Sequence, residues 1–107
     1  DSTPPENPGA FTGILSGYDS ILLTWDEGSD NVALDSYSIE RREKPLAGSY
    51  GAWYFLKSVG SGFNYTDDTQ ALGNNVTYDY RIRAVDTSNN YADSYKYIDN
   101  PVTYYNI

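Results

Sequence analysis

Eleven consecutive residues decide the fold class of this chain: Val76-Thr77-Tyr78-Asp79-Tyr80-Arg81-Ile82-Arg83-Ala84-Val85-Asp86. From Val76 to Ala84 every second residue is apolar, and the residues between them are polar or charged. Successive side chains of a β-strand point to opposite faces of its sheet. The alternation therefore predicts a strand with one face in a core and the other in water.

The same period of two continues on both sides of this stretch, and no segment keeps a helical period for a dozen residues. The sequence predicts further strands at 11–15, 21–25, around Tyr37 and Ile39, at 53–56, at 65–67 and between 92 and 98. Segments rich in glycine, asparagine and aspartate separate them, as is typical of turns. Short strands at a spacing of about ten residues predict an all-β, seven-stranded antiparallel sandwich.

Length and charge limit what this domain can do. The 107 residues suffice for one domain, which on surface scaling buries about 65% of its surface on folding. The chain has no cysteine and no histidine, which excludes disulfides and thiolate zinc sites and removes the commonest general base. With 7 basic and 15 acidic residues the net charge is -8, so nucleic acid is a poor partner.

The sequence also gives no sign of a membrane-spanning segment. No apolar run approaches about 18 residues, and membrane insertion is not expected.

The positions of the prolines and of the predicted strands divide the sequence into three segments. Residues 1–8 hold three of the five prolines, at Pro4, Pro5 and Pro8, and are predicted to form an extended linker. Residues 9–98 are predicted to form the folded domain. Residues 99–107 either end the last strand, past Pro101, or lead into a next module.

Several residues stand in an order that is similar to a known family. Prolines precede the first strand, Trp25 closes the second, and Leu72 stands six residues before Tyr78, which opens the segment 78–86. On these residues the chain resembles a fibronectin type III domain over about residues 5–98. The resemblance implies an immunoglobulin-like sandwich in which Tyr78 packs on the core, bonds upstream backbone through its hydroxyl, and lies over Leu72.

The loops depart from the family pattern at two places. Gly73-Asn74-Asn75 replaces the usual proline and glycine before Tyr78, and Asn89-Asn90 stands where glycine-asparagine is common. Asparagine tolerates positive φ better than most residues, so both turns can still form. The core is expected to contain Trp25, Tyr37, Leu72, Tyr78, Tyr80 and Ile82, with Phe11, Trp53 and Tyr65 as further aromatic members.

The chain has more aromatic residues than a small core can use: twelve tyrosines, two tryptophans and three phenylalanines. Tyr54 alternates with Trp53 and is expected to face solvent, and Tyr95 and Tyr97 share one face of a strand. Exposed aromatic rings can stack on sugars, so Tyr54, Tyr95 and Tyr97 are candidate contacts for a glycan or a partner. The alternative is that these tyrosines are ordinary strand residues or touch a neighbouring module.

Other polar residues give weaker signals. Asp67 and Asp68 are adjacent in an extended segment, so they point to opposite sides and cannot flank one glycosidic bond. The loops 26–31 and 86–90 offer oxygens for calcium, but such residues also serve ordinary turns. We expect no catalytic residue, cofactor or metal site.

Four arginines lie on two strands that this fold places side by side. Arg41, Arg42, Arg81 and Arg83 form either a basic patch or exposed pairs with Glu40, Asp79 and Asp93. Adhesive members of the family carry Arg-Gly-Asp in the loop before the last strand, and residues 86–90 lack it. Integrin binding through that motif is therefore not expected.

The function expected from these observations is that of a non-catalytic module, monomeric when isolated, in a larger extracellular protein. Residues 29–32 and 83–86 resemble the bacterial branch of the family, whose members accompany secreted polysaccharide-degrading enzymes or decorate bacterial surface proteins. The alternative is a decoration domain on a bacteriophage tail or virion, with weak cell-wall glycan binding through exposed tyrosines. Its partners would be neighbouring domains of the same chain and, for a binder, a polysaccharide. A third possibility is protein docking at an exposed strand edge.

Overall fold

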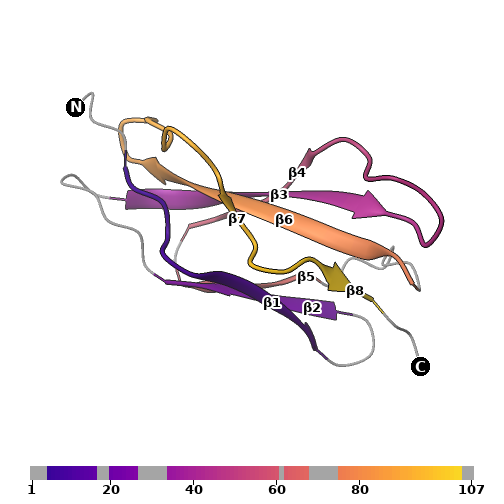
Figure 1. The fold of residues 1–107 in the computed structure, drawn as a ribbon. Coiled ribbons are helices and arrows are strands. Elements are labelled where there is room, and N and C mark those ends of the chain that lie inside the picture. Colours follow the sequence, from indigo (N-terminus) through magenta and orange to yellow (C-terminus); the bar gives the residue numbers. More distant parts are fainter. Residues whose placement is uncertain (1–4, 17–19, 27–33, 61, 68–74, 105–107) are drawn as a thin grey trace.

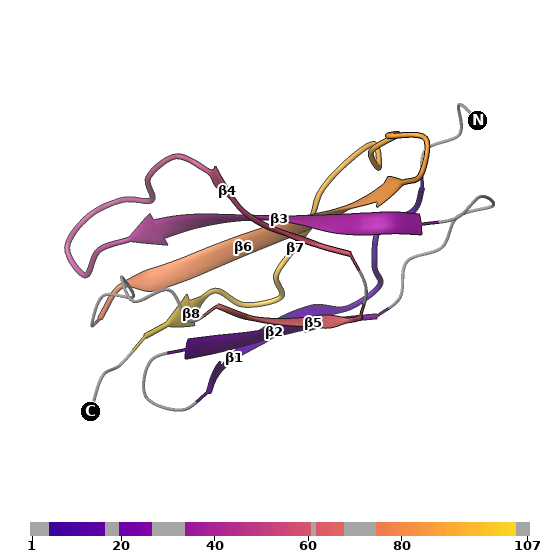
Figure 2. The ribbon, with the colours of Figure 1, turned by 180° about the vertical axis from the view of Figure 1, so that it is seen from behind.

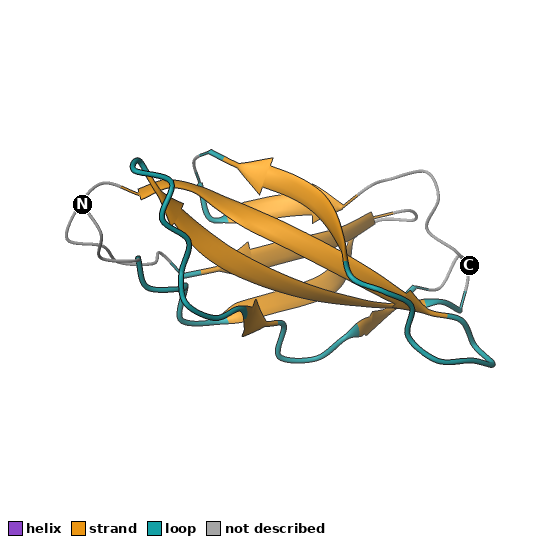
Figure 3. Cartoon of the chain, turned by 90° about the horizontal axis from the view of Figure 1, so that it is seen from above, coloured by secondary structure: helices purple, strands orange, loops and turns teal. Residues whose placement is uncertain are grey.

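A computed structural model of the protein describes residues 5–16, 20–26, 34–60, 62–67 and 75–104. Within these ranges the chain forms strands and loops without a helix, as Figure 3 shows. The strands are β1 (Phe11–Ser16), β2 (Ser20–Trp25), β3 (Leu34–Lys44), β4 (Tyr54–Val59), β5 (Asn64–Asp67), β6 (Thr77–Asp86), β7 (Lys96–Tyr97) and β8 (Val102–Thr103). This confirms the all-β fold predicted from the alternating pattern. In the described ranges there is accordingly no helix long and apolar enough to cross a membrane.

The strands form two antiparallel sheets that lie over each other as layers (Figures 1 and 2). The smaller sheet has the order β1-β2-β5 and the larger one the order β4-β3-β6-β7, with β8 also paired to β6. The neighbouring strands of both sheets pair antiparallel. The predicted seventh strand is divided into β7 and β8 by residues 98–101. Pro101 lies in this interval, and proline has no N–H to donate to a sheet.

The core lies between the two layers and is centred on aromatic rings. Among the residues expected there, Trp25, Tyr37, Tyr78, Tyr80 and Ile82 are each at most 4% exposed. The Trp25 ring meets those of Phe11 and Tyr37 edge to face, with centroids 6.1 and 5.5 Å apart. Edge-to-face contacts suit the ring quadrupoles and add to the free energy gained by burial. Leu72 and the backbone before residue 75 lie outside the described residues, so the expected partners of Tyr78 there stay predictions.

Trp53 is not a core residue, contrary to the expectation. It stands just before β4, outside the buried cluster, and its ring lies against Arg42 and Arg81. Both arginines point away from the core, because they alternate with the buried residues of β3 and β6. The error has a physical cause: β4 has no fully buried position, so alternation within it does not mark a core face.

Both ends of the described chain are held by hydrogen bonds to β6 or to the residues next to it. On the N-terminal side the Asn7 side chain accepts from the Ala84 N–H at 3.0 Å and donates to the Ser94 carbonyl. On the C-terminal side the Tyr104 N–H donates to the Val76 carbonyl at 2.9 Å, and the Asn75 N–H donates to the Tyr104 carbonyl at 2.7 Å. Residues 102–103 therefore belong to the sandwich, whereas the domain boundary at residue 9 stays a prediction.

Two turns contain asparagines in the left-handed backbone region. Asn75, just before β6, has φ 66°, and Asn89, in the turn after β6, has φ 65°. Asparagine enters this region more readily than most residues. The two departures from the family's loop pattern are thus compatible with the turns, as expected.

Candidate functional site

Side chains on the outer face of the larger sheet form an alternating series of arginines and aromatic rings. Arg42 lies on β3, and Arg81 and Arg83 lie on β6. Each guanidinium carbon is 3.8 to 4.6 Å from the centroids of two rings, within the range of cation–π attraction. In order of contact, this arginine–aromatic ladder consists of Tyr50, Arg42, Trp53, Arg81, Tyr95, Arg83 and Tyr91.

Two of the three ladder arginines also face a carboxylate across the sheet. Arg42 is in register with Asp79, and its Nε and Nη2 atoms both lie 3.0 Å from Asp79 Oδ2. Arg81 is in register with Glu40, and its Nε and Nη2 atoms lie 2.7 and 2.5 Å from Glu40 Oε1. The sequence predicted both partners but expected exposed pairs, whereas Asp79 is 6% exposed and both pairs are part-buried. Asp93, the third expected partner, makes no ion pair with an arginine in the described ranges.

Arg83 differs from the other two ladder arginines. Its neighbour across the sheet is Ser38, and its guanidinium lies between the rings of Tyr91 and Tyr95, at 4.5 and 4.4 Å. The Arg83 Nε atom is buried and has no hydrogen-bond acceptor among the residues that the structure describes. This side chain is therefore a positioned cation without a carboxylate partner in that part of the chain.

The three tyrosines proposed as contacts do not form one patch. Tyr97 is 50% exposed and meets Trp53 edge to face at 5.9 Å, and Tyr95 is half-buried in the ladder. Tyr54 is 38% exposed, but its hydroxyl bonds to Arg41 and Glu43. Tyr95 and Tyr97 thus belong to the face that carries Trp53, whereas Tyr54 belongs to a different cluster.

That second cluster is built on a buried ion pair, so the expectation that Arg41 lies in a basic patch or in an exposed pair was wrong. Arg41 Nη1 donates to Asp67 Oδ2 at 2.6 Å, and the Tyr80 hydroxyl donates to the same oxygen at 2.6 Å. Arg41 is 5% exposed and Asp67 is fully buried. Because Asp67 lies on β5 and its partners lie on β3 and β6, the pair joins the two sheets. A signal was present: Arg41 continues the inward alternation of Tyr37 and Ile39.

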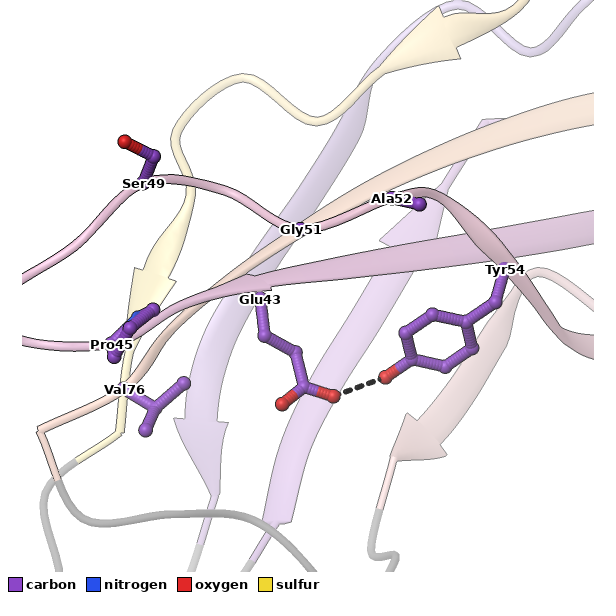
Figure 4. A pocket seen from close by; sticks show the side chains of 7 residues that line it. All are labelled: Glu43, Pro45, Ser49, Gly51, Ala52, Tyr54 and Val76. Atoms are coloured by element: carbon purple, nitrogen blue, oxygen red, sulfur yellow. Dashed lines mark hydrogen bonds between the residues drawn. The ribbon is translucent and has the colours of Figure 1, made fainter.

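The cluster reaches the surface at a shallow pocket of about 470 Å³. Arg41 Nε donates to the Tyr54 hydroxyl at 2.6 Å, and that hydroxyl donates to Glu43 Oε1 at 2.5 Å. Figure 4 shows the Tyr54 and Glu43 side chains meeting at the pocket. The pocket is lined by Glu43, Pro45, Ser49, Gly51, Ala52, Tyr54 and Val76.

Burial and these hydrogen bonds shift several pKa values. Burial, reinforced by the hydrogen bond to Glu43, raises the pKa of Tyr54 to about 12. Burial and then the charge of Asp67 raise the pKa of Tyr80. Burial alone would lower the pKa of Arg41, but its hydrogen bond and ion pair with Asp67 raise it. All three groups are therefore held in the protonation state that their hydrogen bonds require.

The carboxylates of the Arg41 cluster and of the turn after β6 are occupied by structural bonds. Asp67 accepts from Arg41 and Tyr80, and Glu43 accepts from Tyr54. In the turn after β6, Asp86 Oδ1 accepts from the backbone N–H groups of Ser88 and Asn90 at 2.9 and 2.8 Å. Asp86 thus uses its oxygens for the turn, which is one of the two roles considered for this loop. The loop 27–31 lies outside the described residues, as does Asp68.

Comparison with known proteins gives similar folds but no sequence family. No family model matches the chain, and no curated protein does. The twitchin kinase region from C. elegans aligns over 97% of this chain and 17% of its own, with TM-score 0.72 and 19% identity. The spore cortex lytic enzyme SleM of Clostridium perfringens aligns over 94% of this chain and 28% of its own, with TM-score 0.65 and 14% identity.

A third similar structure is about the size of this chain. The Fn3-like protein from Clostridium thermocellum aligns over 94% of this chain and 97% of its own, with TM-score 0.64 and 19% identity. This chain spans less than a third of the twitchin region and of SleM. At such low identities the likeness concerns the fold. The strand pairing and these alignments together show that the chain has the immunoglobulin-like β-sandwich fold of fibronectin type III domains.

Proposed function

We propose that the chain is a non-catalytic module that holds neighbouring domains apart in a larger extracellular protein, either a secreted carbohydrate-active enzyme or a bacterial surface protein. This proposal rests on the positions at which the described chain enters and leaves the sandwich, because they lie at opposite ends of β6. Asn7 is bonded next to the end of β6, at Ala84, and Tyr104 is bonded next to its beginning, at Val76. Val76 and Ala84 are eight residues apart along extended chain, which corresponds to about 25 Å at roughly 3.3 Å per residue.

The shape of the molecule suits this role. Its extents are 47 × 26 × 21 Å, and the two sheets run along the longest one (Figure 1). The ion pair of Arg41 with Asp67 joins the sheets through the interior, which favours a rigid body. A rigid module with its ends on opposite sides sets the separation of its neighbours more narrowly than a flexible linker does.

The similar structures give supporting context. Similar domains make up a minor part of a longer lytic enzyme from Clostridium perfringens and of a longer kinase region from C. elegans, and one stands almost alone in a protein from Clostridium thermocellum. A fold of this kind therefore occurs as one module among others. The bacterial context remains part of the proposal.

Time-resolved energy transfer between two fluorescent proteins, one fused to each end of the module, tests the spacer role. We expect a narrow distribution of donor–acceptor distances. A control protein in which a Gly-Ser linker of the same length replaces the module should give a broad one. An equally broad distribution for the module would overturn the spacer role. Hydrolysis of a polysaccharide by the purified module would overturn its non-catalytic character.

A second candidate function is weak glycan binding, as on a virion surface, and the exposure of Tyr97 favours it. Half of Tyr97 is exposed beside Trp53, and an exposed ring can stack on a sugar. Co-sedimentation with insoluble peptidoglycan tests it, with Tyr97→Ala as the variant. Phe55→Ala is the matched control, because Phe55 is 60% exposed and lies outside the ladder. Retention that is equal in both variants would exclude Tyr97 as the contact.

A further inference from the structure

Charges on the outer face of β3 and β6 follow a regular cross-strand pattern. Three successive outward positions of β3 are paired in register with three of β6: Arg42 with Asp79, Glu40 with Arg81, and Ser38 with Arg83. Opposite charges face each other at the first two positions, and ion pairs form at both. At the third position a serine faces the arginine, so the pattern lacks one carboxylate.

Arg83 nevertheless lies between aromatic rings in the same way as its two neighbours. Its guanidinium lies between two tyrosine rings, as those of Arg42 and Arg81 lie between aromatic rings. Its Nε is buried without an acceptor among the described residues, whereas the residue as a whole is only half-buried. The terminal nitrogens are therefore the part of the group that an incoming ligand can reach. A cation that is already positioned loses little entropy when an anion binds to it.

We propose that Arg83, between Tyr91 and Tyr95, binds an Asp or Glu carboxylate of an acidic segment on a protein partner. This carboxylate would take the place that Asp79 and Glu40 fill at the other two arginines. The surrounding residues fit a protein interface, because tyrosine, tryptophan and arginine are enriched at the centres of such interfaces. The proposal goes beyond the spacer role and does not depend on it.

A peptide carboxylate fits this place better than a sugar acid does. A sugar ring needs an open aromatic face beside the cation. Of the two rings at Arg83 only Tyr91 offers one, being 48% exposed, whereas Tyr95 has Arg81 at 3.8 Å and Arg83 at 4.4 Å from its centroid. Trp53 likewise lies against two guanidinium groups. An Asp or Glu side chain is slender and needs only the guanidinium itself. Because the whole chain carries a net charge of -8, we expect a short acidic segment rather than a polyanion.

The test is an NMR titration of the purified protein with a capped Gly-Glu-Gly-Glu-Gly peptide. We expect the Arg83 side-chain signal and the Tyr91 and Tyr95 ring signals to shift and to saturate at millimolar peptide. The same peptide with glutamine in place of glutamate should leave these signals unmoved, because the amide carries no charge. Equal shifts with both peptides would overturn the proposal.

Two variants with matched controls locate the binding at Arg83. Ser38→Glu places a carboxylate opposite Arg83 and should weaken peptide binding about tenfold or more, while Thr66→Glu adds the same charge on the other sheet and should not. Arg83→Gln should abolish the shifts, while Lys57→Gln makes the same change in charge on β4 and should keep them. Thermal melts check that each variant is folded.

Ser38→Glu keeps every ladder residue, so it tests the proposal even if Arg83→Gln fails to fold. Unchanged peptide affinity in Ser38→Glu would overturn the proposal. A parallel titration with glucuronate decides between the sources of the carboxylate. Tighter binding of glucuronate than of the peptide would overturn a protein partner in favour of an acidic glycan.

Discussion

Arg41 and Asp67 form an ion pair inside the sandwich, with their nearest atoms 2.6 Å apart. Burial removes both charges from water, and their mutual attraction and the hydrogen bond from Tyr80 offset this cost. We predict that Asp67→Ala, which leaves Arg41 buried without its partner, lowers the free energy of unfolding by about 3–5 kcal/mol. Urea denaturation at 25 °C measures this.

The control for this substitution is Asp99→Ala, at an exposed carboxylate. It should change the free energy of unfolding by less than about 0.5 kcal/mol. The double variant Arg41→Met with Asp67→Leu should cost less than Asp67→Ala alone, because it removes both charges and leaves neither unpaired. A loss below about 1 kcal/mol for Asp67→Ala would show that the pair does not stabilise the fold.

Tyr54 and Tyr80 connect stability to alkaline pH. Their hydroxyls donate to carboxylates, and burial and these bonds raise the pKa of Tyr54 to about 12 and raise that of Tyr80 as well. The folded protein therefore retains these protons more tightly than the unfolded chain, in which tyrosine ionises near pH 10. This part of the stability is fully present below about pH 10 and is lost as the pH rises through the folded pKa values.

Absorbance of tyrosinate during an alkaline titration checks this prediction. Tyr54→Phe should remove one ionisation near pH 12 and should leave the ionisation of Tyr80 delayed until unfolding. Tyr97→Phe, at an exposed ring, is the control and should leave the ionisation of Tyr54 near pH 12 in place. If all tyrosines of the folded protein ionised together near pH 10, the assignment of these hydrogen bonds would be wrong.

At the scale of elements, the turn between β6 and β7 depends on one backbone conformation and one carboxylate. Asn89 has φ 65°, and Asp86 accepts from two backbone N–H groups and from the Asn90 side chain. Burial would raise the pKa of Asp86, but these hydrogen bonds outweigh it and lower the pKa. The turn is therefore stabilised by the ionised form of Asp86, and this stabilisation is lost as the pH falls through the lowered pKa.

We predict that Asn89→Val destabilises the domain by about 1–2 kcal/mol, because a β-branched residue is strained at positive φ. Asn89→Gly should be neutral within about 0.5 kcal/mol, since glycine adopts this conformation freely. Urea denaturation of both variants beside the wild type measures the difference. If valine and glycine were equivalent at this position, the left-handed conformation of Asn89 would be contradicted.

At the scale of the whole molecule, the net charge of -8 opposes compaction. Salt shortens the range of this repulsion, from about 20 Å at low ionic strength to a few Å near 0.5 M. The ion pairs of the ladder lose little by screening, because they are part-buried and salt screens such pairs much less than exposed ones. We predict that raising NaCl from 20 to 500 mM raises the melting temperature by about 2–5 °C. A decrease would mean that ion pairs outweigh the general repulsion.

The strands and most of the core could be predicted because their signal is local. Alternation along 76–86 alone identifies β6 and its buried face. Trp25 ends β2, and Tyr78 stands near the start of β6. Asn75 and Asn89 could likewise be recognised as turn residues, since tolerance of positive φ belongs to the side chain itself. Leu72 remains a prediction because it lies outside the described residues.

The sites could not be predicted in the same way, since they depend on which residues of different strands face each other. The sequence by itself determined an all-β sandwich, its turns and the aromatic core, because side-chain alternation and backbone preference act over a few residues. Only the tertiary structure decided that Trp53 lies between two arginines, that Arg41 meets Asp67 inside the fold, and that Ser38 faces Arg83. Strand register and sheet stacking fix these contacts between distant segments, and no local pattern encodes them.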